Sequence, residues 1–321
     1  SMLVLVIEYL ILAAITVFAS MKLSEYVDLL DKKTNLSGAF LGGVLLAAVT
    51  SLPEFFTSLT AILKLGNPGL VQGNVLGSNT FNMIIFGLVV FLYTSKYVKA
   101  NIAVSHTKTL IFSIIMCLCV LGAVFMPFEV NIFGVHMNIF SIAIIVIYAI
   151  SVKTMGADDS AENEEEDTSP LTVPQVIVRF LIFTVVVVGA SIFLTLVADK
   201  LSVMLNLGAT VGGALFLGVA TSLPELSASF SLVKINNFNA SVGNVVGSCC
   251  FNFIILGCAD ILYFQGNIYS YDPQIIIFAI AGIIEYLIAM VMLKKQDNVL
   301  IAKIGSVLII ATYIASLALS M

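Results

Sequence analysis

Charged residues are scarce in this chain, and their scarcity excludes most soluble folds. Aspartate, glutamate, lysine and arginine make up 10% of the 321 residues, whereas hydrophobic residues make up 60% and the mean hydropathy is +1.10. A soluble domain carries about 25% charged residues, so this composition is typical of a protein that crosses the membrane several times. We therefore expect the lipid bilayer as its surroundings and no nucleic-acid partner.

The chain also lacks the patterns that indicate an enzyme, a soft-metal centre or a disulfide framework. Its five cysteines all lie inside apolar segments and have no metal-ligand spacing with either of the two histidines. No nucleophile–base pair and no nucleotide-binding motif is present. The sequence predicts buried free thiols, no enzyme activity and no cofactor.

Ten apolar stretches are long enough to cross about 30 Å of hydrocarbon. The fifth is short, and the second and seventh are long enough to tilt or break. The sequence thus predicts an all-α polytopic membrane protein whose ten transmembrane helices lie at roughly 3–24, 37–63, 70–93, 107–126, 137–152, 175–198, 207–233, 240–263, 274–293 and 299–319.

The basic residues predict the orientation. With the N-terminus outside, only Lys64 and Lys200 fall outside, and the other twelve of the 14 basic residues lie in or beside inner loops. Cytoplasmic loops carry an excess of lysine and arginine. The asymmetry predicts that both termini lie outside, in what we expect to be the plasma membrane.

A short phrase occurs twice, once in the second span and once in the seventh. The letters T-S-L-P-E stand at 50–54 and again at 221–225. A second pair of matching blocks follows, G-N-V-L-G-S-N-T-F-N at 73–82 and G-N-V-V-G-S-C-C-F-N at 243–252. Self-similarity of this kind indicates a repeated structural unit. The two motif regions extend over about 36–82 and 207–252.

Each half of the chain contains five spans, so the second copy must enter the membrane from the opposite side. Inverted repeats are typical of secondary transporters, whose sites lie near the midplane where the halves meet. We predict a first five-helix repeat at 1–152, an acidic cytoplasmic linker at 153–174 and a second, inverted repeat at 175–321. The linker is expected to be solvated and disordered; alternatively it gathers cations or forms a weak regulatory Ca2+ site.

Each T-S-L-P-E phrase places a proline and a glutamate inside an apolar run. Pro53 cannot donate a hydrogen bond to the carbonyl of Val49, nor Pro224 to that of Ala220, so we predict that the second and seventh helices are broken. Freed carbonyls and carboxylates inside a membrane need a partner, such as a cation. Proline kinks also occur in helices that bind nothing, but two kinks beside two symmetry-related glutamates favour a binding site.

Four polar stripes follow helical spacing. Residues at i, i+4 and i+8 share one face of a helix, and the stripes are Thr50-Glu54-Ser58, Asn74-Ser78-Asn82, Thr221-Glu225-Ser229 and Asn244-Ser248-Asn252. Glycines at 73 and 77, and at 243 and 247, make a small-xxx-small pattern that permits close helix packing. We expect the third and eighth helices to press against the second and seventh.

These stripes offer carboxylate, hydroxyl and amide oxygens but no histidine or thiol. Oxygen ligands favour hard cations such as Ca2+ or Na+ over Zn2+ or Cu+. The two glutamates carry a charge of −2, which one Ca2+, several Na+ ions or two protons could neutralise. This choice of occupants is the natural basis of an exchange cycle.

With these two phrases, both repeats resemble the alpha repeats of the sodium/calcium exchanger family within the Ca2+/cation antiporters. The resemblance implies a secondary active antiporter that exchanges Na+ for Ca2+ by alternating access, with the first and sixth spans sliding across the core. It implies metal ligands at Glu54, Glu225, Thr50, Ser51, Thr221, Ser222, Ser78 and Ser248 and at the carbonyls of Ala47 and Gly218, to which the stripes add Asn82 and Asn252.

Alternatives remain at this point. Asn252 stands where some relatives, including the K+-dependent branch, have an aspartate, which argues against K+ dependence. A H+-coupled Ca2+/cation antiporter could use the same two glutamates, and a cation channel could be lined by the same stripes. A channel would pass ions with no counter-ion and would need a continuous polar path.

Some polar residues lie outside the two motif regions. Glu285 is in the middle of the ninth span without an equivalent in the first half; we expect it to face inward and pair with a neighbour, with a transport or proton-relay role as the alternative. Asp260, His106 and His136 lie near span ends, where we expect them at the membrane interface.

Overall fold

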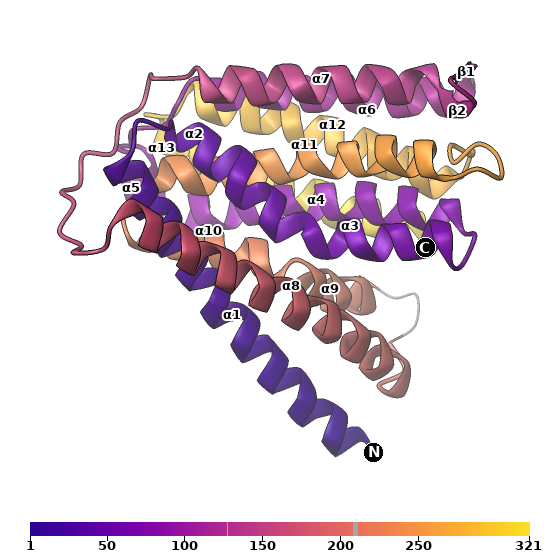
Figure 1. The fold of residues 1–321 in the computed structure, drawn as a ribbon, viewed down its shortest axis with the longest axis horizontal. Helices are drawn as coiled ribbons and strands as arrows, with labels where there is room; N and C mark the ends of the chain where they lie inside the picture. Colours follow the sequence, from indigo (N-terminus) through magenta and orange to yellow (C-terminus); the bar gives the residue numbers. More distant parts are fainter. Residues whose placement is uncertain (127, 208–210) are drawn as a thin grey trace.

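The chain is built almost entirely of helices (Figure 1). The computed structural model describes residues 1–126, 128–207 and 211–321. The first half contains α1 (Met2–Lys33), α2 (Gly38–Phe40), the π-helix η1 (Leu41–Leu46), α3 (Ala47–Leu63), α4 (Pro68–Leu92), α5 (Thr94–Tyr97), α6 (Ser105–Phe125) and α7 (Ile139–Gly156). The second half contains α8 (Val173–Met204), α9 (Val211–Thr221), α10 (Leu223–Lys234), α11 (Phe238–Leu262), α12 (Pro273–Lys294) and α13 (Val299–Ser320).

The described residues form nine helices that are long and apolar enough to cross a membrane, and the bent pair α9–α10 makes a tenth span. This confirms the all-α polytopic fold. The sequence did not predict the short hairpin of β1 (Glu129–Ile132) and β2 (Val135–Asn138) between α6 and α7. Phe133 and Gly134 at its turn have positive φ angles of 52° and 79°.

Equivalent residues begin equivalent helices in the two halves. The side chain of Asn67 accepts a hydrogen bond from the backbone N–H of Leu70 at the start of α4, and that of Asn237 accepts one from Ala240 at the start of α11. Each asparagine satisfies one of the N–H groups that a helix leaves free at its first turn. The repeat is therefore visible in local capping as well as in sequence.

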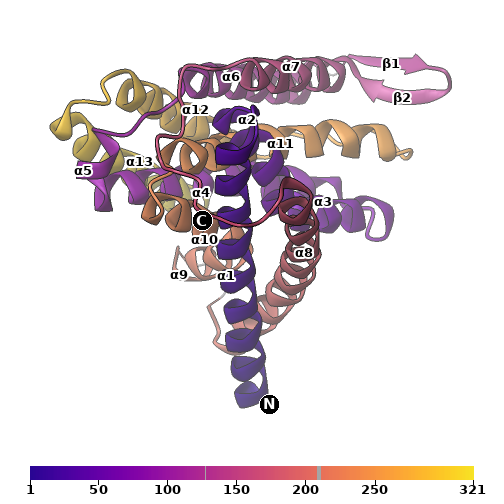
Figure 2. The same cartoon turned by 60° about the vertical axis from the view of Figure 1, so that its left-hand side comes forward.

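Helices α1 and α8 lie side by side and cross the remaining helices obliquely (Figures 1 and 2). Near the N-terminus they extend away from the bundle, and large apolar side chains such as Leu3, Leu10 and Val185 are exposed there. An apolar face of this extent on a membrane helix is suited to contact with lipid. The pair corresponds to the first and sixth spans.

The predicted break in the second span is not at Pro53. The span runs as one helix from Gly38 to Leu63, and its irregular part is η1, one turn before Thr50. The π-helical turn contains Gly42 and Gly43, against which α11 packs closely. This packing supports the helix from one side, so the missing N–H of proline does not bend it sharply.

The seventh span is broken as predicted. Helix α9 ends at Thr221 and α10 begins at Leu223, with a bend of 68° at Ser222. Pro224 lies in the first turn of α10, where its missing N–H costs nothing because that position has no helical acceptor. Gly218 and Thr221 remain α-helical on the other side of the break.

The glycines of the two repeats pack differently. A Cβ atom added to Gly247 would collide with the backbone of Gly43, and one added to Gly243 would lie 2.9 Å from the nitrogen of Gly43. By contrast, a Cβ atom on Gly73 or Gly77 would meet no atom of the described residues within 4 Å. The small-xxx-small pattern thus brings α11 against the second span, whereas α4 has no equally close neighbour at the same position among the residues that the structure describes.

The segment between α7 and α8 is irregular and mostly exposed, as expected of a solvated linker, but it is docked on the helices, which differs from the expected disorder. Asn163 Nδ2 donates to Asp28 Oδ1 at 2.9 Å, and Lys33 Nζ on α1 lies 2.8 Å from Asp167 Oδ2. The backbone N–H of Ser105 donates to Asp158, 2.7 Å away. Burial raises the pKa of Asp158, but hydrogen bonds with Ser105 and Ser160 prevail and lower it to about 2.

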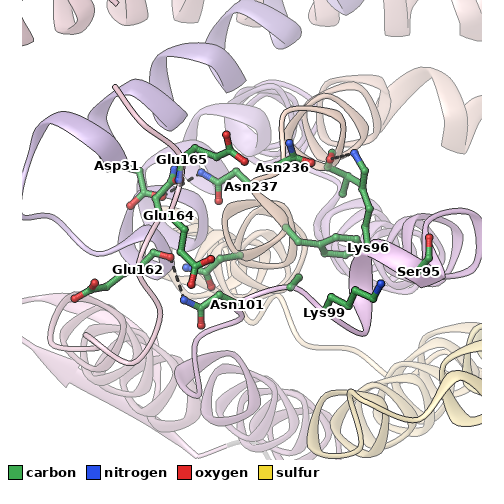
Figure 3. Close-up of a pocket in the computed structure, with 15 residues that line it drawn as sticks. Asp31, Ser95, Lys96, Lys99, Asn101, Glu162, Glu164, Glu165, Asn236 and Asn237 are labelled. Carbon is green, nitrogen blue, oxygen red and sulfur yellow. Dashed lines mark hydrogen bonds between the residues drawn. The ribbon is translucent and has the colours of Figure 1, made fainter. Parts of the chain in front are cut away.

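A pocket of about 430 Å³ lies beside this segment (Figure 3). Its glutamates, among them Glu162 and Glu164, lie on one side and Lys96 and Lys99 on the other. Across the described part of the chain, no cluster of three or more histidine, cysteine or acidic side chains could hold a metal. The segment therefore gives no support to a regulatory Ca2+ site.

The glycine packing predicts unequal responses to two equivalent substitutions. Gly247→Ala should lower the melting temperature in detergent, because a methyl group at this contact forces α11 and the second span apart, at a cost of about 1–3 kcal/mol. Gly77→Ala is the matched control and should leave the melting temperature unchanged or slightly raised. Equal losses of stability in both variants would contradict the asymmetry.

Candidate cation-binding site

Two glutamates from the two repeats lie near each other at the centre of the bundle. Glu54 lies on α3 and Glu225 in the first turn of α10, close enough for the two charges to repel each other. Glu225 is 1% exposed, whereas Glu54 is partly exposed. Ser51 lies beside the Glu225 carboxyl group. The T-S-L-P-E phrases therefore contribute to one site, as their inverted arrangement predicts.

The two threonines of the phrases hold equivalent backbone carbonyls. Thr50 Oγ1 lies 3.3 Å from the carbonyl oxygen of Ala47, and Thr221 Oγ1 lies 3.2 Å from that of Gly218. Both contacts span three residues within a helix. The carbonyls expected to serve as ligands thus occupy matching places in the two repeats, with a hydroxyl group next to each.

Asn244 connects the halves, although the predicted ligand set left it out. Its Oδ1 is 3.2 Å from the Thr50 hydroxyl, while its Nδ2 donates to Ser229 Oγ at 3.0 Å and to the Glu225 carbonyl at 3.4 Å. The i, i+4 stripe of α11 already contained the signal, because Asn244 lies one turn before Ser248. Its side chain positions groups of α3 and α10 relative to each other.

Most of the predicted ligand side chains carry a buried polar atom with no hydrogen-bond partner among the described residues. Each buried polar atom left without a hydrogen bond lowers the stability of the folded protein by about 1–3 kcal/mol. Seven of the ten predicted side-chain ligands have one: Ser51, Glu54, Asn82, Ser222, Glu225, Ser248 and Asn252. They lie on α3, α4, α10 and α11, helices that pack against one another, or at the break before α10.

These atoms are mostly oxygens, and two belong to carboxyl groups. The set suits a hard cation, which bonds to carboxylate, hydroxyl and amide oxygens. The described residues contain no cluster of three acidic, cysteine or histidine side chains. Any cation held here would depend on neutral oxygens in addition to the two glutamates.

The two repeats differ in how deeply they bury their stripes. Asn244 and Ser248 on α11 are fully buried, but their equivalents Asn74 and Ser78 on α4 are exposed and partly exposed. At the opposite ends of the stripes, Asn252 and Asn82 are both buried, and Asn252 Nδ2 donates to Asn79 Oδ1 at 2.9 Å. The site is therefore covered beside α11 and more open beside the N-terminal half of α4.

Two residues expected at the membrane interface are buried within the protein. Asp260 is 2% exposed and accepts a hydrogen bond of 2.7 Å from the backbone N–H of Asn138, which ties α11 to the end of the hairpin. His106 is fully buried, and its Nε2 lies 2.8 Å from Asn239 Oδ1. Both predictions were wrong because tertiary packing supplied a protein partner at each helix end. His136 is half exposed and lies beside Glu129 in the hairpin.

The cysteines do not form a soft-metal site. Cys249 Sγ lies 3.7 Å from the carbonyl oxygen of Asn79, and Cys250 Sγ lies 3.2 Å from Ser113 Oγ. All five cysteines are free thiols. Cys249 and Cys250 on α11 pack against α4 and α6.

Comparison with known proteins agrees with this architecture. The family model described as sodium/calcium exchanger protein matches residues 4–155 and 175–321, which is nearly the whole chain. The match leaves out the linker between the two halves.

Two curated proteins and one solved structure illustrate the likeness. The chain is 27% identical to the uncharacterized membrane protein MJ0091 of Methanocaldococcus jannaschii, with 88% of this chain and 87% of that protein covered. It is 23% identical to the inner membrane protein YrbG of Escherichia coli, with 82% of each covered. Its fold matches the sodium-calcium exchanger NCX_Mj, soaked with Na+ and Sr2+, with a TM-score of 0.74, 20% identity and 99% of both chains covered.

The repeats, the spans and the paired central glutamates are thus accompanied by a family match that covers both halves of the chain. Exchangers are transporters and not enzymes. The chain is an integral membrane protein that belongs to the sodium/calcium exchanger family.

Proposed function

We propose that this protein is a secondary active antiporter that exchanges Na+ for Ca2+ across the membrane. The observation that carries the proposal is that Glu54 and Glu225, from opposite repeats, lie close enough to repel each other, while predicted ligand side chains on the packed helices α3, α4, α10 and α11 carry buried polar atoms without a hydrogen-bond partner among the described residues. Two carboxylates near each other repel, so their joint burial favours a state in which cations neutralise them. One Ca2+ or several Na+ ions can do so, and competition for the same oxygens couples the two fluxes.

We assign the predicted ligands the following roles around the two glutamates. Glu54 and Glu225 supply the charge, and the hydroxyl groups of the two phrases together with Ser78 and Ser248 supply neutral oxygens. The carbonyls of Ala47 and Gly218 extend the site along the two helices. Asn82 and Asn252 complete it, and Asn244 positions Thr50 against α10.

The asymmetry of the repeats supports alternating access. The seventh span bends by 68°, and the equivalent second span bends so little that α11 lies tightly along it. If the second span took the bent shape and the seventh span took the straight, tightly packed one, the site would close on the side of α4 and open on the side of α11. Helices α1 and α8 lie across the core in a position that allows them to slide with this change.

The distribution of basic residues gives the orientation of the proposed cycle. With the N-terminus outside, the loosely packed half of α4 faces outward, and the tight contact of α11 with η1 faces the cytoplasm. The docked acidic segment 157–172 then lies on the cytoplasmic side. We infer that the conformation described is open to the outside, in a plasma membrane.

A H+-coupled antiporter is the second candidate. The same two glutamates could carry protons in place of Na+, because a buried carboxyl pair readily holds protons. A H+-coupled protein would exchange Ca2+ in a pH gradient without Na+. A channel is less well supported, because the tight glycine contact between α11 and the second span interrupts a polar path on one side.

The deciding experiment is Ca2+ uptake into proteoliposomes driven by an outward Na+ gradient. The wild type should take up Ca2+ only when Na+ leaves the vesicles, because both ions require Glu54 and Glu225. Glu54→Gln and Glu225→Gln should each lower uptake by roughly 30-fold or more, since the loss of one buried charged partner costs about 2–5 kcal/mol. Glu8→Gln, an exposed carboxyl on α1, is the control and should transport normally.

Uptake that a pH gradient drives and Na+ does not would favour the H+-coupled alternative. Uptake without any counter-ion would favour a channel. Normal exchange by either glutamine variant would show that the site lies elsewhere.

The position of Asn244 makes a second prediction. Asn244→Ala should weaken the apparent Ca2+ affinity roughly tenfold, since its side chain holds Thr50, Ser229 and the backbone of Glu225, and leaving such buried groups unpaired costs about 1–3 kcal/mol. Asn74→Ala, at the equivalent exposed position, should have a smaller effect. The concentration dependence of Na+-driven Ca2+ uptake measures both, and equal losses would contradict the positioning role.

The outward-open conformation predicts unequal chemical labelling. In a background without native cysteines, Asn74→Cys should react from the outside with a membrane-impermeant thiol reagent, because the side chain at this position is exposed. Asn244→Cys should be protected, since position 244 is buried. Reaction of Asn74→Cys only from the cytoplasmic side would reverse the proposed orientation.

A further inference from the structure

Glu285 is a buried carboxyl group that the two-glutamate site does not use. It lies in the middle of α12, its side chain is 0% exposed, and neither of its carboxyl oxygens has a hydrogen-bond partner among the described residues. The prediction that it pairs with a neighbour was therefore wrong. It resembles the predicted cation ligands in having unpartnered oxygens, but it is separate from them in the fold.

The helices packed against α12 bring no positive charge to Glu285. Helix α4 has no titratable residue, and α6 contributes Cys117, whose Sγ lies 3.5 Å from the carbonyl of Ala279. The titratable groups within electrostatic range of Glu285 are Cys249 on α11, Tyr313 on α13 and its neighbour Tyr286. The lysines of the α12–α13 pair are exposed on the surface: Lys294, Lys295 and Lys303.

These surroundings determine whether a metal ion, a basic side chain or a proton neutralises the Glu285 carboxyl group. A bare carboxylate in an apolar interior costs several kcal/mol and needs a cation partner. None of the ion pairs in the described part of the chain includes Glu285. The described residues also contain no cluster of three or more acidic, cysteine or histidine side chains that could hold a metal ion around it. A proton is the occupant that these surroundings allow, and the neutral carboxyl group tolerates burial.

The position of Glu285 connects this proton to the cation site. Cys249, which lies within electrostatic range, directly follows Ser248 on α11, and the same helix carries Asn252. Loss of the proton would add a negative charge within electrostatic range of the part of α11 that carries these residues, and that charge would strengthen the binding of a cation there. By linkage, the binding of a cation must favour release of the proton to the same extent.

We propose that Glu285 is a proton-binding site, distinct from the pair Glu54 and Glu225, whose proton is released when cations bind to the ligands on α11. The inference rests on the proposed function in that it takes Ser248 and Asn252 as ligands. It adds a separate group through which pH acts on exchange. As pH rises the proton leaves, the carboxylate attracts the cation, and the affinity for Ca2+ increases.

The first test compares the pH dependence of Ca2+ affinity in Na+-driven uptake. The affinity of the wild type should increase with pH, and Glu285→Gln, which keeps the shape of the neutral form, should fold, transport and show a flatter profile. Glu285→Asp retains a titratable group and should keep a pH-dependent profile with a shifted midpoint. Glu8→Gln should behave as the wild type.

The second test measures protons released when Ca2+ is added to the purified protein in weakly buffered detergent solution with a pH indicator. Glu285→Gln should release fewer protons than the wild type, while any release from Glu54 and Glu225 remains. Identical pH profiles and identical proton release in wild type and Glu285→Gln would overturn the proposal. If Glu285→Gln does not fold, an unchanged midpoint in Glu285→Asp would overturn it.

The two proposals fail in different ways. Absence of Na+-driven uptake in the wild type would refute the Na+/Ca2+ function, and the proton-release measurement, which needs no gradient, would still decide the role of Glu285. Normal uptake with no change in either pH readout would refute the Glu285 site alone.

Discussion

The structure depends on how two carboxyl groups are accommodated inside a membrane. A carboxylate in hydrocarbon is costly unless a cation, a proton or a set of polar groups neutralises it. Glu54 and Glu225 come from opposite halves of the chain and lie near each other, so neither serves as the counter-charge of the other. The helices α4 and α11, which pack against α3 and α10, carry polar stripes in which several buried polar atoms have no partner among the described residues. Cation exchange follows from this arrangement.

The two repeats have the same motifs but differ in backbone packing at the equivalent glycines of α11 and α4. Gly247 brings α11 against Gly43, whereas the equivalent Gly77 has no such close neighbour among the described residues. The bend at Ser222 accompanies this difference, because α9 turns away where the second span continues straight. One sequence motif thus occurs in two packings within one molecule, which is what alternating access needs from an inverted repeat.

The segment after α7 and Glu285 on α12 carry acidic groups outside the pair Glu54 and Glu225. The acidic segment after α7 is tied to α1 through Asn163 and Lys33, so an exposed segment expected to be disordered contacts a helix that crosses the core. Glu285 on α12 is buried, and its carboxyl oxygens have no hydrogen-bond partner among the described residues. Glu285 has no equivalent in the first repeat, and the acidic segment lies between the repeats.

The sequence by itself determined the ten spans, the inverted repeat and the glutamate pair, because hydropathy, duplication and intramembrane charge are local properties of the chain. Only the tertiary structure decided that the second span stays continuous through Pro53 while the seventh bends at Ser222, so that Pro53 lies inside a helix and Pro224 in the first turn of one. Tertiary packing likewise buried Asp260 and His106, placed Asn244 between the halves and left Glu285 without a hydrogen-bond partner in the described part of the chain. The physical reason is that the partner of a polar side chain comes from another helix, whose position no local pattern specifies.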